Sequence, residues 1–289
     1  MINPLKIKRR GRLVARFSSV AASATRVWNF AETHSQTARD AIAEANSIIV
    51  ETHEIKLSRL PKKLDGFRIV QLTDLHHSPF TDAKQIMNAI DLANSLDADI
   101  VALTGDYVSH EAEYVAPIAE MMAKVKSKYG TYAILGNHDH WTDGEFMTKC
   151  LRDEGIRVLI NEGFRFEAND EKFWLCGVDD AMASVSDLKS AVKGSFEDEF
   201  KLLLSHNPSI ISRAARRKID LVLSGHTHGG QVKIRQQSEN SLFPEYRRIS
   251  GLHRRYETQI YVSRGIGTVV LPVRYQCPPE VSLLILRSV

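Results

Sequence analysis

Cysteine, one-sided charge and long apolar runs are all scarce in this 289-residue sequence. Its three cysteines, Cys150, Cys176 and Cys277, are far apart and form no Cys-x-x-Cys pair. They therefore indicate neither a disulfide framework nor a thiolate metal site, and we expect buried thiols. The formal net charge of +3 is too small to predict a nucleic-acid partner, and no motif predicts a specific protein partner. The sequence has no internal repeat and no low-complexity tract.

Basic residues are concentrated at the N-terminus. Seven of them precede the first acidic residue, Glu32: Lys6, Lys8, Arg9, Arg10, Arg12, Arg16 and Arg26. Apolar side chains between Leu13 and Ala31 recur at helical spacing, with Arg12 and Arg16 on the other face, which predicts a basic amphipathic helix. We therefore predict an N-terminal helical extension over residues 1–46 and one α/β domain over residues 47–289.

This predicted helix is compatible with more than one location. Residues 5–31 can lie on an anionic membrane surface with their arginines at the phosphates, and packing on the chain's own domain is the alternative. Arg9-Arg10 weakly resembles a twin-arginine export signal, but Arg12 and Arg16 interrupt its hydrophobic region. No apolar run approaches the roughly 20 residues that a transmembrane helix needs. We predict a location in the cytoplasm or at the periphery of the inner membrane.

Polar side chains of metal-ligand type follow four predicted strands. The apolar pattern predicts these strands over residues 67–73, 100–104, 131–135 and 201–205. The first strand is followed by Asp74 and His76, the second by Asp106, the third by Asn137 and the fourth by His206. Sites on open α/β sheets lie at such strand ends, so this recurrence predicts one shared site.

Two more histidines lie in a glycine-rich segment that follows the short apolar strand predicted over 221–223. His226 and His228 are spaced i, i+2, so both imidazoles project to the same side of an extended backbone. The glycines around them let the backbone turn sharply beside a site. Alone, such a pair is more often a polar turn, but the ligands at the other strand ends favour a metal site.

The remaining elements are predicted from the same patterns. Helices are expected over 34–49, 82–95, 113–125 and 143–154, and further strands over 47–57, 157–160, 164–168, 173–178, 232–234, 259–262 and 281–286. The segment Asn161-Glu162-Gly163 is a predicted turn. Asp179-Asp180 has no histidine beside it in the sequence and predicts a loop that begins a helix, not a ligand pair.

A long polar loop is predicted over residues 236–256. It contains the cluster Arg247, Arg248, Arg254 and Arg255. These guanidinium groups can bind a second phosphate of a substrate, and a solvated loop is the alternative.

The seven candidate ligands exceed what one divalent ion needs. They are Asp74, His76, Asp106, Asn137, His206, His226 and His228. Two ions close together require a bridging carboxylate, and Asp106 is the natural choice because it is alone on its loop. Oxygen and imidazole ligands without thiolate favour manganese, iron, zinc or cobalt over copper.

These motifs resemble the five ordered motifs of the calcineurin-like metallophosphoesterases. They are Asp74-x-His76, Gly105-Asp106, Gly136-Asn137-His138-Asp139, His206 and Gly225-His226-Thr227-His228, and they cover about residues 67 to 231. The segments Arg264–Thr268 and Pro278–Glu280 extend the resemblance to the bacterial phosphodiesterase branch that includes YkuE and YaeI. The resemblance implies a four-layer αββα sandwich of two mixed sheets.

The resemblance also implies roles for individual residues. Asp74, His76, Asp106 and His228 would hold one ion, and Asp106, Asn137, His206 and His226 the other. A hydroxide that bridges the two ions would attack phosphorus in line. His138 would neutralise charge on the phosphoryl group or protonate the leaving oxygen, and Asp139 would orient His138. We expect the extra histidines His77 and His140 to support ligands or to face solvent, and His110 and His253 to be ordinary loop residues.

A metal-dependent phosphodiesterase is therefore the leading interpretation, and three alternatives stay open. The basic helix is compatible with a pyrophosphatase that cleaves a UDP-2,3-diacylglucosamine-type lipid precursor at the membrane. A nuclease would use the same diester chemistry on DNA. A non-catalytic scaffold with the same fold would lack ligands, whereas every expected ligand is present here.

Overall fold

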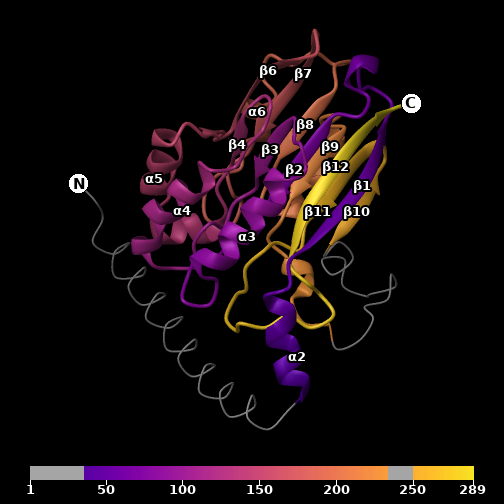
Figure 1. Ribbon diagram of the computed structural model, residues 1–289. Helices are drawn as coiled ribbons and strands as arrows, with labels where there is room; N and C mark the ends of the chain where they lie inside the picture. Colours follow the sequence, from indigo (N-terminus) through magenta and orange to yellow (C-terminus); the bar gives the residue numbers. More distant parts are fainter. Residues whose placement is uncertain (1–35, 234–249) are drawn as a thin grey trace, which may run out of the picture.

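Two six-stranded sheets pack face to face, and helices cover their outer sides (Figure 1). The computed structural model describes residues 36–233 and 250–289. The predicted helix within residues 5–31 and the side chains of Arg247 and Arg248 lie outside this described part. The layers of helix, sheet, sheet and helix confirm the predicted αββα sandwich, while the division of the chain at residue 46 stays a prediction.

The first sheet has the strand order β1-β12-β2-β3-β4-β5. Its strands are β1 (Ile49–Leu57), β2 (Arg68–Leu72), β3 (Ile100–Leu103), β4 (Thr131–Ala133), β5 (Arg157–Val158) and β12 (Glu280–Ser288). Strands β2 to β5 are parallel, whereas β12 is antiparallel to β2. The helices over this sheet are α3 (Ala83–Asn94), α4 (Val115–Met122) and α5 (Asn137–Asp153) (Figure 1). The carboxyl ends of β2, β3 and β4 consequently meet at one edge.

The second sheet has the order β10-β11-β9-β8-β7-β6. Its strands are β6 (Glu162–Ala168), β7 (Glu171–Gly177), β8 (Lys201–Leu204), β9 (Leu221–Ser224), β10 (Gly251–Arg255) and β11 (Thr258–Val262). Strands β7, β8, β9 and β11 are parallel, and the two edge strands are antiparallel to their neighbours. The short helices α6 (Leu188–Ala191) and α7 (Ile211–Arg216) pack on its outer side. This sheet also presents a row of strand carboxyl ends.

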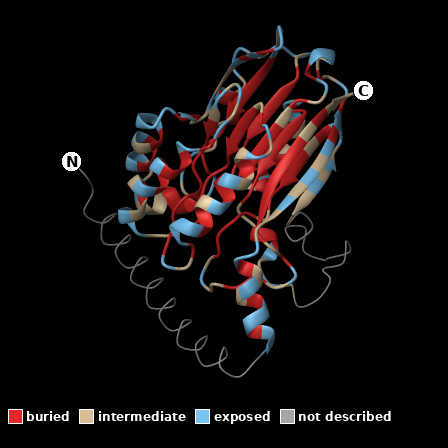
Figure 2. Cartoon of the chain, viewed as in Figure 1, coloured by how far each residue is buried: buried red, intermediate tan, exposed pale blue. Residues whose placement is uncertain are grey.

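The central strands are buried on both faces. Every residue of β3, β8 and β9 is buried, which is the pattern of parallel strands covered on two sides (Figure 2). Side chains of both sheets, such as Ile69, Leu204 and Leu223, form the core between them. Burying each such side chain contributes about 1.5–3 kcal/mol. This shared core fixes the position of the strand ends of one sheet relative to those of the other.

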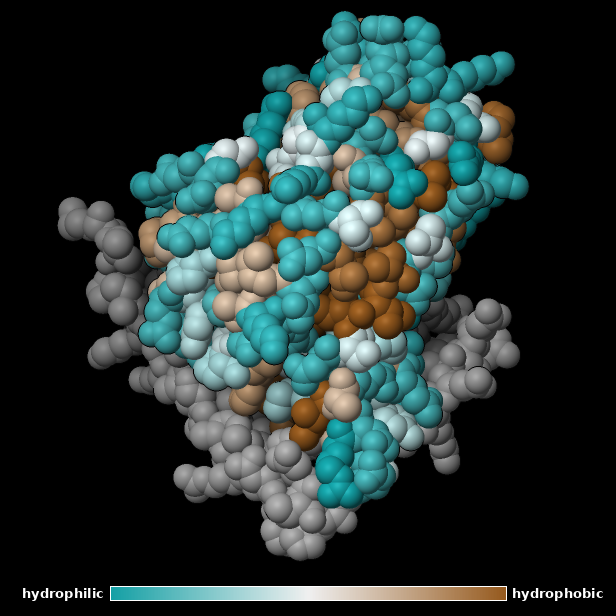
Figure 3. Space-filling view, viewed as in Figure 1, coloured by the Kyte–Doolittle hydropathy of each residue, from teal (hydrophilic) through white to brown (hydrophobic). Residues whose placement is uncertain are grey.

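One part of the outer surface is less well covered. No described helix lies over the outer side of β1 and β12, and Figure 3 shows a hydrophobic patch there beside α3. Ile48, Leu92 and Ile285 are partly buried residues of this region. Within residues 36–233 and 250–289, no helix has both the length and the apolar character to cross a bilayer.

Short elements connect the strands. They are helix α2 (Gln36–Ala45) and the 3-10 turns η1 (Lys62–Leu64), η2 (Ala112–Tyr114), η3 (Pro208–Ile210) and η4 (His228–Gly230). Helix α2 is shorter than the helix predicted over 34–49, because β1 begins at Ile49. The helix predicted over 82–95 is present as α3, and Asp82 caps it, since its side chain accepts a hydrogen bond from the Gln85 amide.

Two predicted boundaries are wrong around α5 and β6. Helix α5 begins at Asn137 instead of Asp143, because the Asp139 side chain accepts the Gly136 amide and stabilises the first turn. The non-helical φ of −164° at Asp143 kinks the helix and interrupts its apolar period. Glu162 and Gly163 belong to β6 instead of a turn.

Three further predictions fail in the second half of the chain. No helix begins at Asp180, since a turn follows and α6 begins only at Leu188. The end of the predicted polar loop forms strand β10, whose polar residues suit an edge strand with one open face. Val232 makes an isolated bridge to Tyr275 instead of starting a strand.

Candidate metal centre

The candidate ligands meet where the carboxyl ends of the two sheets converge. Asp74 and His76 follow β2, Asp106 follows β3, and Asn137 opens α5 after β4. The second sheet contributes three histidines, listed by strand: His206 after β8, then His226 and His228 after β9. All of these side chains are buried except His226, which is half-buried. The structure therefore brings all seven sequence-predicted ligands into one place.

Two groups of ligand atoms lie close together, and a third group, His76, Asp106 and His138, shares a member with each of them. Asp74, His76 and His228 each offer one ligand atom within 4.8 Å of the others, and Asp106, His206 and His226 do the same. Asp106 Oδ2 lies 3.1 Å from His206 Nε2 and 3.6 Å from His76 Nε2. One carboxylate thus contacts a histidine of each group, which is the position of a bridging ligand.

The backbone at these ligands is left-handed. Five of the seven have a φ between 47° and 73°: Asp74, His76, Asp106, His226 and His228. This conformation costs about 1–3 kcal/mol at a residue other than glycine and is concentrated at functional sites. Hydrogen bonds compensate for part of the cost, since the His226 amide donates to both Asp74 carboxylate oxygens at 3.0 Å. The fold therefore imposes a left-handed backbone conformation on five of the candidate ligands.

Two motif glycines are required by close packing. A Cβ atom on Gly136 would clash with the Asp106 carboxylate, and one on Gly225 would clash with Asp74 and Thr73. Gly136 lies where two loops of the first sheet meet, and Gly225 lies where a loop of the second sheet meets one of the first. Any larger residue at either position would push a carboxylate out of place.

Burial and charge set the protonation of the ligands. Burial lowers the pKa of His76 and His228 well below the ordinary value of 6.5, and that of His226 to about 4. Burial also opposes charge on His206, but the Asp106 carboxylate outweighs it and raises the pKa of His206 to about 10. Conversely, His206 and His138 overcome the effect of burial on Asp106 and hold its pKa well below the ordinary value.

The donor set fits divalent cations. His76 Nε2 and His228 Nε2 lie 3.0 Å apart, and burial lowers the pKa of both rings, which favours the neutral form that binds metal. Asn137 Oδ1 is buried and has no hydrogen-bond partner in the described part of the chain. Buried oxygens and imidazole nitrogens without a thiolate suit manganese, iron, zinc or cobalt. A positive charge is also what the adjacent carboxylates of Asp74 and Asp106 require.

Asp139 does not orient His138, contrary to the prediction. Its carboxylate accepts the amides of Asp106, Tyr107 and Gly136 at 2.8 Å each. Burial and the nearby Asp106 charge raise the pKa of Asp139 to about 7. Because Asp139 lies in the first turn of α5, its side chain points back at the β3 and β4 loops instead of at the neighbouring ring. It therefore shapes the Asp106 loop.

His138 is held by other groups. Its Nδ1 lies 2.7 Å from the Ser109 carbonyl oxygen, so Nδ1 carries the donated proton. Its ring centroid is 4.8 Å from that of His76, 4.8 Å from His110 and 4.9 Å from Trp141. The prediction that His110 is an ordinary loop residue is therefore wrong. Burial lowers the pKa of His110 to about 4, which makes it a neutral ring beside His138.

His140 makes a contact that the sequence did not indicate. Its Nε2 lies 2.5 Å from Asp179 Oδ1, although the two residues are 39 positions apart. Asp179 also accepts the Ser184 hydroxyl at 2.6 Å. This ion pair connects helix α5, which covers the first sheet, with the loop after β7 of the second sheet. His140 therefore helps to hold the two sheets together.

His77 is not solvent-facing. It is buried, its Nδ1 contacts the Thr81 carbonyl oxygen at 3.0 Å, and its ring packs against Tyr114 at 4.6 Å. These contacts turn its ring toward residues outside both ligand groups.

Arg274 is a residue that sequence reasoning missed. It is fully buried, and its guanidinium donates to carbonyl oxygens instead of pairing with a carboxylate. The closest of these are Gly267 at 2.6 Å and Arg264 at 2.8 Å, and His228 follows at 3.5 Å. The loop that it holds packs on the ligands, because a Cβ on Gly265 would clash with Asp74. A single arginine that follows a short apolar run carries no signal that could have revealed this role.

Arg254 and Arg255 contact residues of their own hairpin. Arg254 forms an ion pair with Glu257 at 2.6 Å, and the Arg255 guanidinium lies 5.8 Å from the centre of the Tyr256 ring. Their role in substrate binding stays a prediction.

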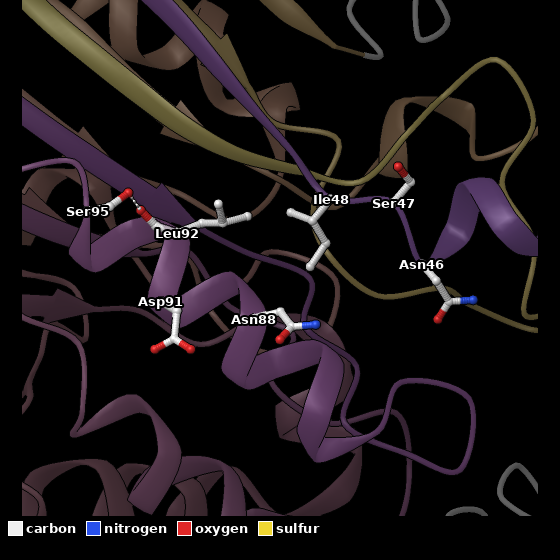
Figure 4. Close-up of a pocket in the computed structure, with 7 residues that line it drawn as sticks. All are labelled: Asn46, Ser47, Ile48, Asn88, Asp91, Leu92 and Ser95. Atoms are coloured by element: carbon white, nitrogen blue, oxygen red, sulfur yellow. Dashed lines mark hydrogen bonds between the residues drawn. The ribbon is translucent and has the colours of Figure 1, made fainter.

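A cavity of about 500 Å³ lies away from these ligands (Figure 4). It is lined by Asn46, Ser47 and Ile48 of the α2–β1 connection and by Asn88, Asp91, Leu92 and Ser95 on α3 or at its end. No candidate metal ligand lines this cavity, so we do not expect metal to bind in it.

Several known proteins have sequences related to this chain. The family model described as calcineurin-like phosphoesterase matches residues 67–230. The metallophosphoesterase YkuE of Bacillus subtilis is 30% identical over 85% of this chain and 87% of its own length. The phosphodiesterase YaeI of Escherichia coli is 31% identical over 75% of this chain and 81% of its own. A transmembrane protein with metallophosphoesterase domain from Bos taurus is 31% identical, and the match spans 57% of that longer protein.

Proposed function

Because this chain belongs to the calcineurin-like phosphoesterase family, we propose that it is a phosphodiesterase that works with two divalent metal ions. The observation that carries this proposal is the pair of ligand groups contributed by both sheets, with Asp106 in contact with each. The coarser statement, that the chain is a metal-dependent phosphoester hydrolase, follows from the family. Preference for diesters is supported by the name of the related phosphodiesterase YaeI.

The residues divide into two sets of ligands. We assign Asp74, His76, Asp106 and His228 to one ion, and the second set is Asp106, Asn137, His206 and His226. When bound, two such cations activate water near neutral pH and neutralise charge that develops during in-line displacement at phosphorus. As a ligand of both ions, Asp106 would keep the two ions close together. The neutral rings of His76, His226 and His228 leave their nitrogens available without first losing a proton.

His138 is placed to handle a proton at the reacting phosphate. With Nδ1 donating to Ser109, the opposite nitrogen, Nε2, is the one that can donate a proton to the leaving oxygen when the ring is charged. Trp141 and His110 pack on the same ring and would exclude water from the leaving-group side. Asp139 supports this step indirectly, by holding the loop that carries Asp106.

The location of the substrate is a second part of the proposal. The basic residues of the N-terminal sequence support peripheral contact of residues 5–31 with an anionic inner-membrane surface, from the cytoplasmic side. The related transmembrane protein from Bos taurus supports action at a membrane.

The test compares bis-p-nitrophenyl phosphate with p-nitrophenyl phosphate. Metal-stripped protein receives manganese, zinc, iron or no metal, and we expect diester cleavage to return only with metal. A matched control is His53→Gln, because His53 lies on β1 against Tyr261 and belongs to neither ligand group. Faster cleavage of the monoester would contradict the diester preference. Full activity without metal would contradict the metal-dependent mechanism.

A further inference from the structure

A buried carboxylate that the ligand assignment does not use follows β7. Asp180 is 2% exposed, and its Oδ1 accepts the amides of Met182 at 2.8 Å and Ala183 at 3.1 Å. Its Oδ2 is also buried but has no hydrogen-bond partner among the described residues. A buried oxygen without a partner costs free energy, and most such atoms in proteins are paired. The shape of the loop therefore explains Oδ1 but not Oδ2.

Strand pairing places Asp180 beside the second ligand set. This set consists of Asp106, Asn137, His206 and His226. Strand β7 is parallel to β8, with Gly177 opposite Leu204, and the Val178 amide donates to the Leu204 carbonyl oxygen at 3.1 Å. Asp180 and His206 each come two residues after this hydrogen-bonded pair. Both residues therefore lie just past the ends of neighbouring parallel strands.

The same loop is also held against α5. Asp179 Oδ1 lies 2.5 Å from His140 Nε2 and accepts the Asp180 amide at 3.0 Å. His140 is in the first turn of α5, which begins at Asn137. The loop after β7 is thus fixed both to the helix that carries Asn137 and to the strand that precedes His206. These are two members of the second ligand set.

The charges that act on Asp180 belong to this set. Burial has the largest effect and raises the pKa of Asp180 above its ordinary value. The charged groups that act on it are His206, which lowers this pKa, and Asp106, which raises it. By contrast, Asp180 is not among the main charges that act on His76 or His228. Its carboxylate is therefore directed at one ligand set and not at the other.

Two divalent ions would bring more positive charge than the ligand carboxylates balance. The ions carry four positive charges, whereas Asp74 and Asp106 supply two negative ones and imidazoles bind metal in their neutral form. A third buried carboxylate close to an ion offsets part of this difference, and the ion in turn compensates for the burial of that carboxylate.

We propose that Asp180 is a positioning residue that raises the affinity of the second ligand set for its metal ion. Within the described residues, Asp180 belongs to none of the groups that could hold an ion directly, so its carboxylate acts from outside the set through its charge. Oδ1 fixes the carboxylate to its own loop, and Oδ2 provides the charge that faces the set. The inference rests on the metal binding in the proposed function and is independent of the diester preference.

The test is a calorimetric titration of the metal-stripped full chain with manganese. Asp180→Asn keeps an oxygen for the Met182 and Ala183 amides but removes the charge. We expect it to bind one of two manganese ions about tenfold more weakly than the wild type, a change of about 1.4 kcal/mol. The matched control is Asp187→Asn, which removes the same charge from the same loop. Asp187 accepts the Ser190 amide as the N-cap of α6, a position that asparagine fills equally well, so this variant should bind both ions like the wild type.

Two backgrounds identify the ion that is affected. His228→Gln should keep only the ion of the second ligand set, and His206→Gln should keep only the other ion. Addition of Asp180→Asn should weaken the remaining ion about tenfold in the His228→Gln background and much less in the His206→Gln background. Equal weakening in the two backgrounds would contradict the assignment to the second set.

The stability of the metal-free protein separates this role from a structural one. Because burial makes the ionised carboxylate unfavourable, metal-free Asp180→Asn should melt at or above the wild-type temperature. A carboxylate that only shapes its loop would instead make the variant melt lower, with metal and without it.

Several outcomes would overturn the inference. They are wild-type manganese affinity in Asp180→Asn, equal weakening in Asp187→Asn, a metal-free Asp180→Asn protein that melts lower or does not fold, and a wild type that binds no manganese. If the wild type binds two manganese ions but cleaves no diester, the proposed function fails, and the affinity comparison still decides this inference.

Discussion

The two sheets contribute different chemistry to the same centre. The first sheet supplies every candidate oxygen ligand, through Asp74, Asp106 and Asn137, together with one imidazole, that of His76. The second sheet supplies only imidazoles. Two of the ligand groups draw on both sheets, since His228 joins Asp74 and His76, and His206 and His226 join Asp106. The group of His76, Asp106 and His138 comes from the first sheet alone. The first sheet therefore positions the carboxylates, and the second sheet adds the imidazoles that complete the two ligand groups.

This division explains why the site lies between the sheets. Burial lowers the pKa of His226 and His228, so these rings are neutral near pH 7, whereas the raised pKa of His206 favours its charged form beside Asp106. None of the three rings therefore repels the carboxylates of the first sheet. The inter-sheet core fixes their separation, because the strands that carry the ligands are buried on both faces. Metal binding and sheet packing should consequently support each other.

The largest effect is expected from the shared carboxylate. Asp106→Asn keeps an oxygen that can accept the His138 amide but removes the charge that faces both ligand groups. We expect diester turnover to fall by roughly 10³-fold or more, with loss of bound metal and with the fold retained. Turnover, metal content and far-ultraviolet circular dichroism are the measurements. Wild-type turnover in this variant would show that Asp106 does not bridge.

A smaller and more selective effect is expected from the imidazoles of the second sheet. His228→Gln removes a ligand of the group with Asp74, and His206→Gln removes one of the group with Asp106. Each variant should lose one of two bound ions, because the other group keeps its ligands. Metal analysis after gel filtration measures the stoichiometry, and simultaneous loss of both ions in both variants would instead indicate a single cooperative site.

Substitution of Arg274 tests how the loop between β11 and β12 is held against the candidate ligands. Arg274→Met leaves several buried carbonyl oxygens without a donor, and we expect a loss of about 2–4 kcal/mol in the free energy of unfolding. Arg274→Lys keeps the charge but not the planar set of donors, so it should be intermediate. Urea unfolding measures both, and metal affinity should fall along with stability since this loop packs against Asp74. Wild-type stability of Arg274→Met would contradict this role.

The smallest effect is expected at the ion pair between His140 and Asp179. Hydrogen bonding to Asp179 overcomes burial and raises the pKa of His140, and the pKa of Asp179 is lowered in turn. The His140 contribution is therefore complete below its ordinary value of 6.5 and is lost as the pH rises through the raised value. The Asp179 contribution is present above its ordinary value of 3.8 and is lost as the pH falls through the lowered value.

His140→Ala should consequently lower stability most between these two ordinary values. Because the pair is partly exposed, we expect a loss of about 1 kcal/mol or less at about pH 5 and a smaller loss at about pH 9. Urea unfolding of the wild type and the variant at both pH values measures it, with His53→Gln as the reference. A loss that is equal at both pH values would exclude a charge-dependent contribution.

Sequence reasoning succeeded where a chemical group follows a local pattern. Each buried strand has a short apolar run, and residues of ligand type come directly after it, so the strand ends and the seven candidate ligands could be predicted. Their role as metal ligands stays a prediction. It failed where a role depends on a distant partner. The neighbour of His140 is 39 residues away, and the carbonyl oxygens held by Arg274 come from several loops. The function of Asp139 was misjudged because adjacency in sequence suggested a contact with His138.

The sequence by itself determined the architecture and the ligand inventory, because hydrophobic periodicity and residue type are local properties. Only the tertiary structure decided the grouping of ligands across the two sheets, the left-handed backbone at five of them and the packing of His110 and Trp141 on His138. The same is true of the Gln231 side chain, which donates to the carbonyl oxygens of Val269 and Leu271. These features depend on distances between segments far apart in the chain, which burial of a common core establishes and no local pattern records.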